Sequence, residues 1–85
     1  MEKETELEID ENKIDDAALA LLYLTMHKDK YSVRAWKSID WDVMDRLHEK
    51  GYISNPQSKA KSVAVTLEGE EKSKELFFKL FGASN

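Results

Sequence analysis

The chain has 85 residues, a net charge of −4 and no cysteine, which excludes disulfides, zinc–thiolate sites and cysteine nucleophiles. Its length suits one small domain, and a composition of 41% hydrophobic and 35% charged residues is typical of a soluble globular protein. Because cysteine is absent and no signal peptide opens the sequence, we expect a cytoplasmic protein.

Charge is distributed unevenly along the sequence. Residues 1–16 carry eight acidic side chains and two lysines, a net charge of −6, whereas residues 28–61 carry eight basic and five acidic side chains, a net charge of +3. Acidic segments with few apolar residues bury too little surface to become ordered. We therefore expect residues 1–8 to form a disordered arm, residues 9–82 to form the domain, and residues 83–85 to form a tail.

The first predicted helix begins after Asp10, whose carboxylate suits an N-cap, with Ile9 and Ile14 at the positions of a hydrophobic staple. One apolar face has helical spacing and consists of Ile14, Ala17, Ala18, Leu21 and Leu22. A second stripe points nearly the opposite way and consists of Leu19, Tyr23 and Met26. A helix that is apolar on two sides is either central in its domain or meets another subunit, and burial within the domain is slightly favoured.

Residues 31–38, with the sequence YSVRAWKS, predict either a short strand or a helix of one to two turns. The next helix is clearer, because Asp40 suits its N-cap and Gly51 suits its end. Its inward arc consists of Trp41, Val43, Met44, Leu47 and His48. Its exposed arc consists of Asp42, Asp45, Arg46, Glu49 and Lys50.

Residues 52–66 have the pattern of a β-hairpin. Tyr52 and Ile53 begin a strand, Asn55-Pro56 signals a turn, and residues 59–66 alternate in polarity with two lysines near the tip. Thr66 then suits the N-cap of a last helix that Gly82 ends. The apolar arc of this helix consists of Leu76, Phe77, Leu80 and Phe81, and Phe78 lies outside it.

Three main helices and a two-stranded wing predict an α+β, winged helix-turn-helix-like single domain. The words RLHEKGYI and VAVTLEGEE resemble the recognition helix entering a wing and the wing strand leading to the closing helix of that superfamily. The words ALLYL, AWK, DWD and DRLHEKG, within residues 9–81, resemble a family of small bacterial proteins classed as a domain of unknown function. The resemblance implies one compact, bacterial, cytoplasmic domain and brings no activity, cofactor or catalytic residue.

The predicted core takes apolar residues from each element. It consists of Ile14, Ala18, Leu21, Leu22, Trp36, Trp41, Met44, Leu47, Ile53, Val63, Val65, Leu76, Phe77 and Leu80.

Two binding functions are compatible with this layout. For nucleic acid, the candidate phosphate contacts are Arg34, Lys37, Arg46, Lys50, Lys59 and Lys61. Against it, the sequence is acidic overall, with a pI of about 5.1, and carboxylates share the exposed arc of residues 40–50. For a protein partner or a second copy, the candidate interface residues are Leu19, Tyr23, Met26 and Phe78. The sequence favours the protein-interaction function, and a symmetric dimer would combine the two.

Catalysis is not predicted. The two histidines, His27 and His48, lack metal-ligand spacing, and His48 is predicted to be a core residue bonded to backbone. The aspartates of residues 40–45 lie along a helix rather than in a chelating loop. Trp36 and Trp41 are predicted to pack in the core rather than to stack on a ligand. We therefore expect no cofactor, metal, membrane or small-molecule substrate.

Overall fold

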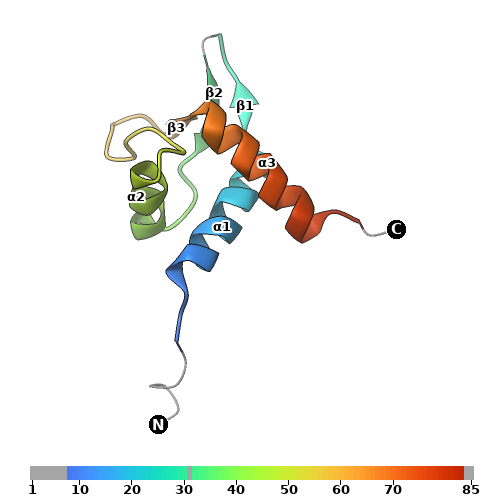
Figure 1. Ribbon diagram of the computed structural model, residues 1–85. Helices are drawn as coiled ribbons and strands as arrows, with labels where there is room; N and C mark the ends of the chain where they lie inside the picture. Colours follow the sequence, from blue (N-terminus) through green and yellow to red (C-terminus); the bar gives the residue numbers. More distant parts are fainter. Residues whose placement is uncertain (1–7, 31, 84–85) are drawn as a thin grey trace.

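The computed structural model describes residues 8–30 and 32–83 and has an α+β fold with the winged-helix layout (Figure 1). The elements in chain order are α1 (Glu11–Leu22), the 3-10 helix η2 (Tyr23–Thr25), β1 (His27–Lys28), β2 (Val33–Trp36), α2 (Trp41–Glu49), β3 (Ser62–Val65) and α3 (Leu67–Phe81). Nearly all of the predicted arm, residues 1–8, lies outside the described residues. Within the described ranges, no helix has the length and apolar character needed to cross a membrane.

The three predicted N-caps are confirmed. The side chains of Asp10, Asp40 and Thr66 accept hydrogen bonds from backbone N–H groups two or three residues further on, at 2.9, 3.1 and 2.9 Å. After α2, Gly51 adopts a left-handed conformation with φ of 86°, which glycine adopts without steric cost. The helix boundaries are therefore set by local chemistry that the sequence displays.

The sheet contains three antiparallel strands in the order β1-β2-β3. Residues 31–38, for which strand and helix were both open, contain β2, and its residues Val33–Trp36 pair with Val65–Ser62 of β3. The predicted first wing strand at Tyr52 and Ile53 is reduced to a single bridge between Ile53 and Val65. Pairing stops there because the Ala64 N–H donates to the Ser54 hydroxyl, at 2.9 Å, instead of to a backbone carbonyl. The wing is thus mainly the loop of residues 54–61.

The core lies between the helices and one face of the sheet. Its buried apolar residues are Ala18, Leu19, Ala20, Leu22, Ala35, Val43, Met44, Leu47, Ile53, Val63, Val65 and Leu76. Eight of the predicted core residues are among them, and Phe77 is partly buried against them. Five predicted core residues are instead exposed: Ile14, Leu21, Trp36, Trp41 and Leu80.

The rotation of α1 about its axis explains part of this difference. The face that α1 buries contains Asp15, Ala18, Leu19 and Leu22, at helical spacing, so Ile14 and Leu21 turn outward. Leu19, predicted as an interface residue, is fully buried within the domain, where its backbone carbonyl accepts a 2.6 Å hydrogen bond from Ser73 of α3. The sequence pattern did not identify this face because it begins with a carboxylate, Asp15, and combines residues from both predicted apolar stripes.

Candidate binding surfaces

The buried carboxylate of Asp15 joins α1 to α2. Its side chain is 1% exposed and accepts hydrogen bonds from Arg46 Nε, at 2.9 Å to each oxygen, and from Lys50 Nζ at 2.9 Å. Arg46 Nη2 lies 2.8 Å from the same carboxylate, and Lys50 also donates to Asn12 at 3.0 Å. Both cations were predicted to lie on the exposed arc of α2 and to contact phosphates, but their charges are directed at Asp15.

Two opposing effects act on the pKa of Asp15. Burial by itself raises this pKa, whereas the hydrogen bonds and charges of Arg46 and Lys50 lower it and outweigh the burial. The pKa of Asp15 therefore lies below its ordinary value. The hydrogen bond to Asp15 is in turn the main cause that raises the pKa of Arg46. Asp15 and Arg46 thus stabilise each other's charged forms.

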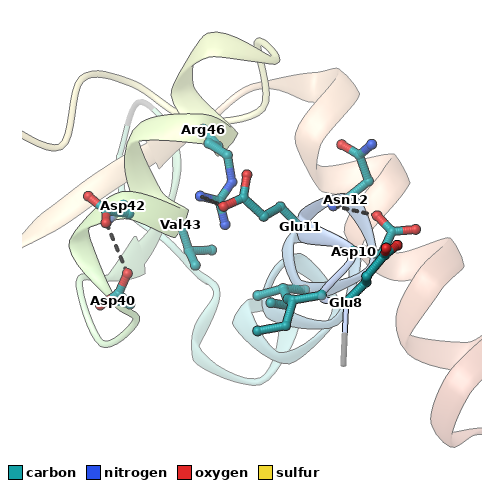
Figure 2. A pocket seen from close by; sticks show the side chains of 10 residues that line it. Glu8, Asp10, Glu11, Asn12, Asp40, Asp42, Val43 and Arg46 are labelled. Carbon is teal, nitrogen blue, oxygen red and sulfur yellow. Dashed lines mark hydrogen bonds and ion pairs between the residues drawn. The ribbon is translucent and has the colours of Figure 1, made fainter. Parts of the chain in front are cut away.

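An open groove of about 990 Å³ separates the first turn of α1 from the first turn of α2 (Figure 2). Its lining residues are Glu8, Ile9, Asp10, Glu11, Asn12, Ile14, Asp40, Asp42, Val43 and Arg46. Figure 2 shows Arg46 reaching from α2 toward Glu11, and the two groups lie 3.7 Å apart. Because Arg46 is shared between Glu11 and Asp15, the remaining carboxylates make this groove acidic, which disfavours a phosphate ligand. The side of α2 that borders this groove is therefore a poor phosphate site.

The other candidate phosphate contacts gather at the sheet and the wing. Arg34 of β2 donates to Ser62 of β3, at 2.7 Å to the hydroxyl and 2.8 Å to the carbonyl oxygen. Lys37 donates to the Ser58 carbonyl at 2.6 Å and lies 6.0 Å from the centre of the Trp41 ring. Lys59 and Lys61 are exposed on the wing. The structure thus separates the six predicted cations into two that contact Asp15 and four in β2, just after it and in the wing.

An aromatic cluster lies where the end of α1 meets the last turns of α3. The Tyr23 ring is 5.1 Å from that of Phe77 and 5.9 Å from that of Phe78, and Phe77 is 5.5 Å from Phe81. Of the predicted interface residues, Tyr23 and Phe78 are therefore neighbours. Met26 packs partly buried against the core, and Leu19 is inside it. We call Tyr23, Phe77, Phe78, Leu80 and Phe81 the aromatic end.

The histidines have structural surroundings. His27 Nδ1 lies 3.0 Å from the Thr25 carbonyl oxygen, and His48 Nδ1 lies 3.0 Å from the Ile53 carbonyl oxygen, which accepts. The prediction that His48 bonds to backbone is confirmed, but His48 lies at the surface rather than in the core. Among the residues described, no group of three or more acidic or histidine side chains is arranged to hold a metal ion.

Comparison with known proteins gives the family. The model of the family described as a domain of unknown function (DUF6429) matches residues 10–83. The chain belongs to this family. It is also similar to the uncharacterized protein y4hR of Sinorhizobium fredii (strain NBRC 101917 / NGR234), with 55% identity over 75 residues that cover 88% of this chain and 97% of that protein. No solved structure matches the chain.

The family match confirms the resemblance predicted from the sequence. It covers α1 to the end of α3, so the sheet, the wing, the aromatic end and all of the acidic groove except Glu8 and Ile9 lie within this DUF6429 domain. The family description names no reaction, so the function has to be argued from these surfaces.

Proposed function

We propose that this DUF6429 protein is a non-catalytic protein-interaction module of the bacterial cytoplasm that pairs with a second copy through its aromatic end. The observation that carries the proposal is the exposure of Phe78, Leu80 and Phe81, which are 54%, 51% and 52% exposed. These residues cover an arc of the helix much wider than the single stripe by which a helix packs on one neighbour. Exposure of this much apolar surface to water is unfavourable, and a partner that buries the surface would gain the corresponding free energy.

The position of Leu80 shows why the domain itself does not cover this end. Leu80 continues the stripe of Gly69, Ser73 and Leu76, all of which are buried, yet Leu80 is half exposed. In Figure 1, α3 runs outward to the C-terminal side, past the part of α1 that it contacts. The last turn of α3 therefore extends beyond the part of α1 that it packs against, and Leu80, on the core-facing stripe, is exposed to solvent.

Charge complementarity favours a second copy as the partner. Glu75 and Lys79 lie one turn apart on α3 and flank Phe78 in sequence. A two-fold axis near Phe77 would run the two α3 helices antiparallel and place Glu75 of each copy opposite Lys79 of the other. Lys79 forms no ion pair within the described residues, and Glu75 has only a 3.9 Å contact with Lys72. The helix is thus complementary to itself in this orientation.

Sedimentation equilibrium over a concentration series tests the proposal. We expect a mass of twice 9.8 kDa for the wild-type protein at concentrations of about 100 μM. Phe78→Glu should give a folded monomer, because it places a charge in the interface at a side chain that the domain leaves half exposed. Leu67→Glu is the matched control: Leu67 is 78% exposed at the other end of α3, so this variant should remain a dimer.

A charge exchange tests the orientation. Glu75→Lys gives each copy two lysines at the interface, and Lys79→Glu gives each copy two glutamates, so each variant alone should dimerise more weakly. An equimolar mixture should recover the association, because every new contact in the mixed dimer joins a lysine to a glutamate. A monomeric wild-type protein would refute the dimer, and a mixture no tighter than either variant would refute the antiparallel arrangement.

A further inference from the structure

We propose that the end of β2 at Trp36, together with the wing, binds single-stranded nucleic acid by stacking a base on the Trp36 indole and holding the backbone phosphates with Arg34, Lys37, Lys59 and Lys61. This surface shares no residue with the aromatic end, so nucleic-acid binding can be tested independently of dimerisation.

The first argument is the placement of Trp36 on the sheet. Side chains alternate along a strand, so Val33 and Ala35 of β2 face one way and Arg34 and Trp36 face the other. Ala35 is fully buried, whereas Trp36 is 51% exposed. The core-facing side of β2 is thus packed, and Trp36 projects from the opposite side, where half of its surface is open to solvent.

The second argument is that the indole is supported from behind. The His27 ring lies 5.0 Å from the Trp36 ring, with 31° between the planes, and His27 is held through the hydrogen bond between its Nδ1 and the Thr25 carbonyl. The His27 ring therefore holds the Trp36 indole in place, while half of the Trp36 side chain stays accessible to a ligand. Exposed aromatic rings of this kind are the platforms on which proteins stack unpaired bases.

The third argument is the charge around the indole. Trp36 pairs with Ser62, and the backbone N–H of Lys37 donates to the carbonyl of Lys61 at 3.0 Å, which ties the wing to the end of β2. The neighbouring cations are Arg34, Lys37, Lys59 and Lys61. The first two donate only to uncharged groups of Ser62 and Ser58.

None of these four cations is paired with a carboxylate within the described residues. An anionic ligand can therefore use their charge without breaking an existing ion pair, unlike at Arg46 and Lys50.

A single strand fits this surface better than a duplex. An indole can stack on a base only where that base is not already stacked between neighbours, as in single strands and loops. The helix that would enter a duplex groove, α2, borders the acidic groove described above. A protein partner with an acidic surface would also meet these lysines, but it would not stack its groups on the indole as a base does.

Fluorescence anisotropy with a labelled DNA single strand of about 12 nucleotides and mixed sequence tests the proposal in about 50 mM salt. We expect Trp36→Ala to weaken binding about tenfold or more, as removal of a base-stacking aromatic does. The Lys59→Glu/Lys61→Glu variant should also bind more weakly and lose part of the salt dependence. Lys13→Glu/Lys74→Glu is the matched control, since it changes the net charge equally on α1 and α3 and should bind like the wild type.

Tryptophan fluorescence reports the stacking directly, because the chain has two tryptophans. Trp41→Phe leaves Trp36 as the single indole, and the DNA should quench its emission. Trp36→Phe leaves only Trp41, whose ring lies 6.0 Å from Lys37 Nζ but is not the proposed stacking surface, so its emission should be quenched less than that of Trp36. Both side chains are half exposed, so circular dichroism should show folded variants.

Three results would overturn the proposal. The first is no binding of the single strand by the wild-type protein. The second is binding that Trp36→Ala leaves unchanged, which would mean phosphate attraction alone. The third is equal affinity for the same sequence as a duplex, which would exclude stacking of an unpaired base. If an acidic protein binds at Trp36 and the single strand does not, the proposal is refuted in the same way as by the first result.

Discussion

Replacing Asp15 by asparagine tests how the two N-terminal helices are held together. The substitution keeps the shape of the side chain but removes a charge that is 1% exposed and accepts from Arg46 and Lys50 at 2.9 Å. Loss of one member of a fully buried ion pair costs about 3–5 kcal/mol. Here the side chains of Arg46 and Lys50 are 25% and 32% exposed and can be hydrated, so we expect a loss of about 2 kcal/mol in the free energy of unfolding.

Urea denaturation followed by circular dichroism measures this change. A loss of about 2 kcal/mol in a domain of this size also lowers Tm by about 10 °C. Asp16→Asn is the matched control: Asp16 is the adjacent residue, forms no ion pair or hydrogen bond through its side chain among the described residues, and should change stability little. If Asp15→Asn were as stable as Asp16→Asn, the cluster would contribute nothing and the argument from burial and pairing would be wrong.

The remaining predictions concern pH and backbone packing. Because the pKa of Asp15 is lowered by folding, its contribution to stability should be complete above the unfolded pKa of about 4 and disappear as pH falls through the lower folded pKa; Asp15→Asn should lack this part of the pH profile measured by denaturation. Gly69→Ala should destabilise the protein by about 3 kcal/mol, since a Cβ at Gly69 would meet the backbone carbonyl of Tyr52, which has no flexible end to move away. Gly51→Ala should cost only about 1 kcal/mol, because its Cβ meets no atom and only the left-handed backbone is strained, and equal losses for the two variants in thermal denaturation would contradict this reasoning.

The exposed tryptophans mark where prediction from the sequence was wrong. Trp36 and Trp41 were assigned to the core because large aromatic residues bury the most apolar area in a small domain. Whether such a residue is buried depends on which side of a strand or helix the rest of the chain covers. The strand β2 turns Ala35 inward and Trp36 outward, and this alternation could not be applied while residues 31–38 were open between strand and helix.

The candidate surfaces were predictable to different degrees. Phe78 was identified as lying off the apolar arc of the last helix, and the structure leaves it exposed beside Tyr23. The basic residues of the wing were also placed correctly at the surface. Arg46 and Lys50 were placed on the exposed arc of α2 because a helical wheel describes one helix at a time. Their partner, Asp15, is 31 and 35 residues away in the sequence.

The amino-acid sequence by itself determined the features that depend on neighbouring residues. The caps at Asp10, Asp40 and Thr66, the stop at Gly51 and the α+β order of elements follow from short-range hydrogen bonding and backbone sterics, which act within a few residues. Only the tertiary structure decided the rotation of α1, the pairing of β2 with β3, the burial of Asp15 and the uncovered end of α3. Each of these depends on which distant segment covers a side chain, and that is fixed only when the whole domain packs.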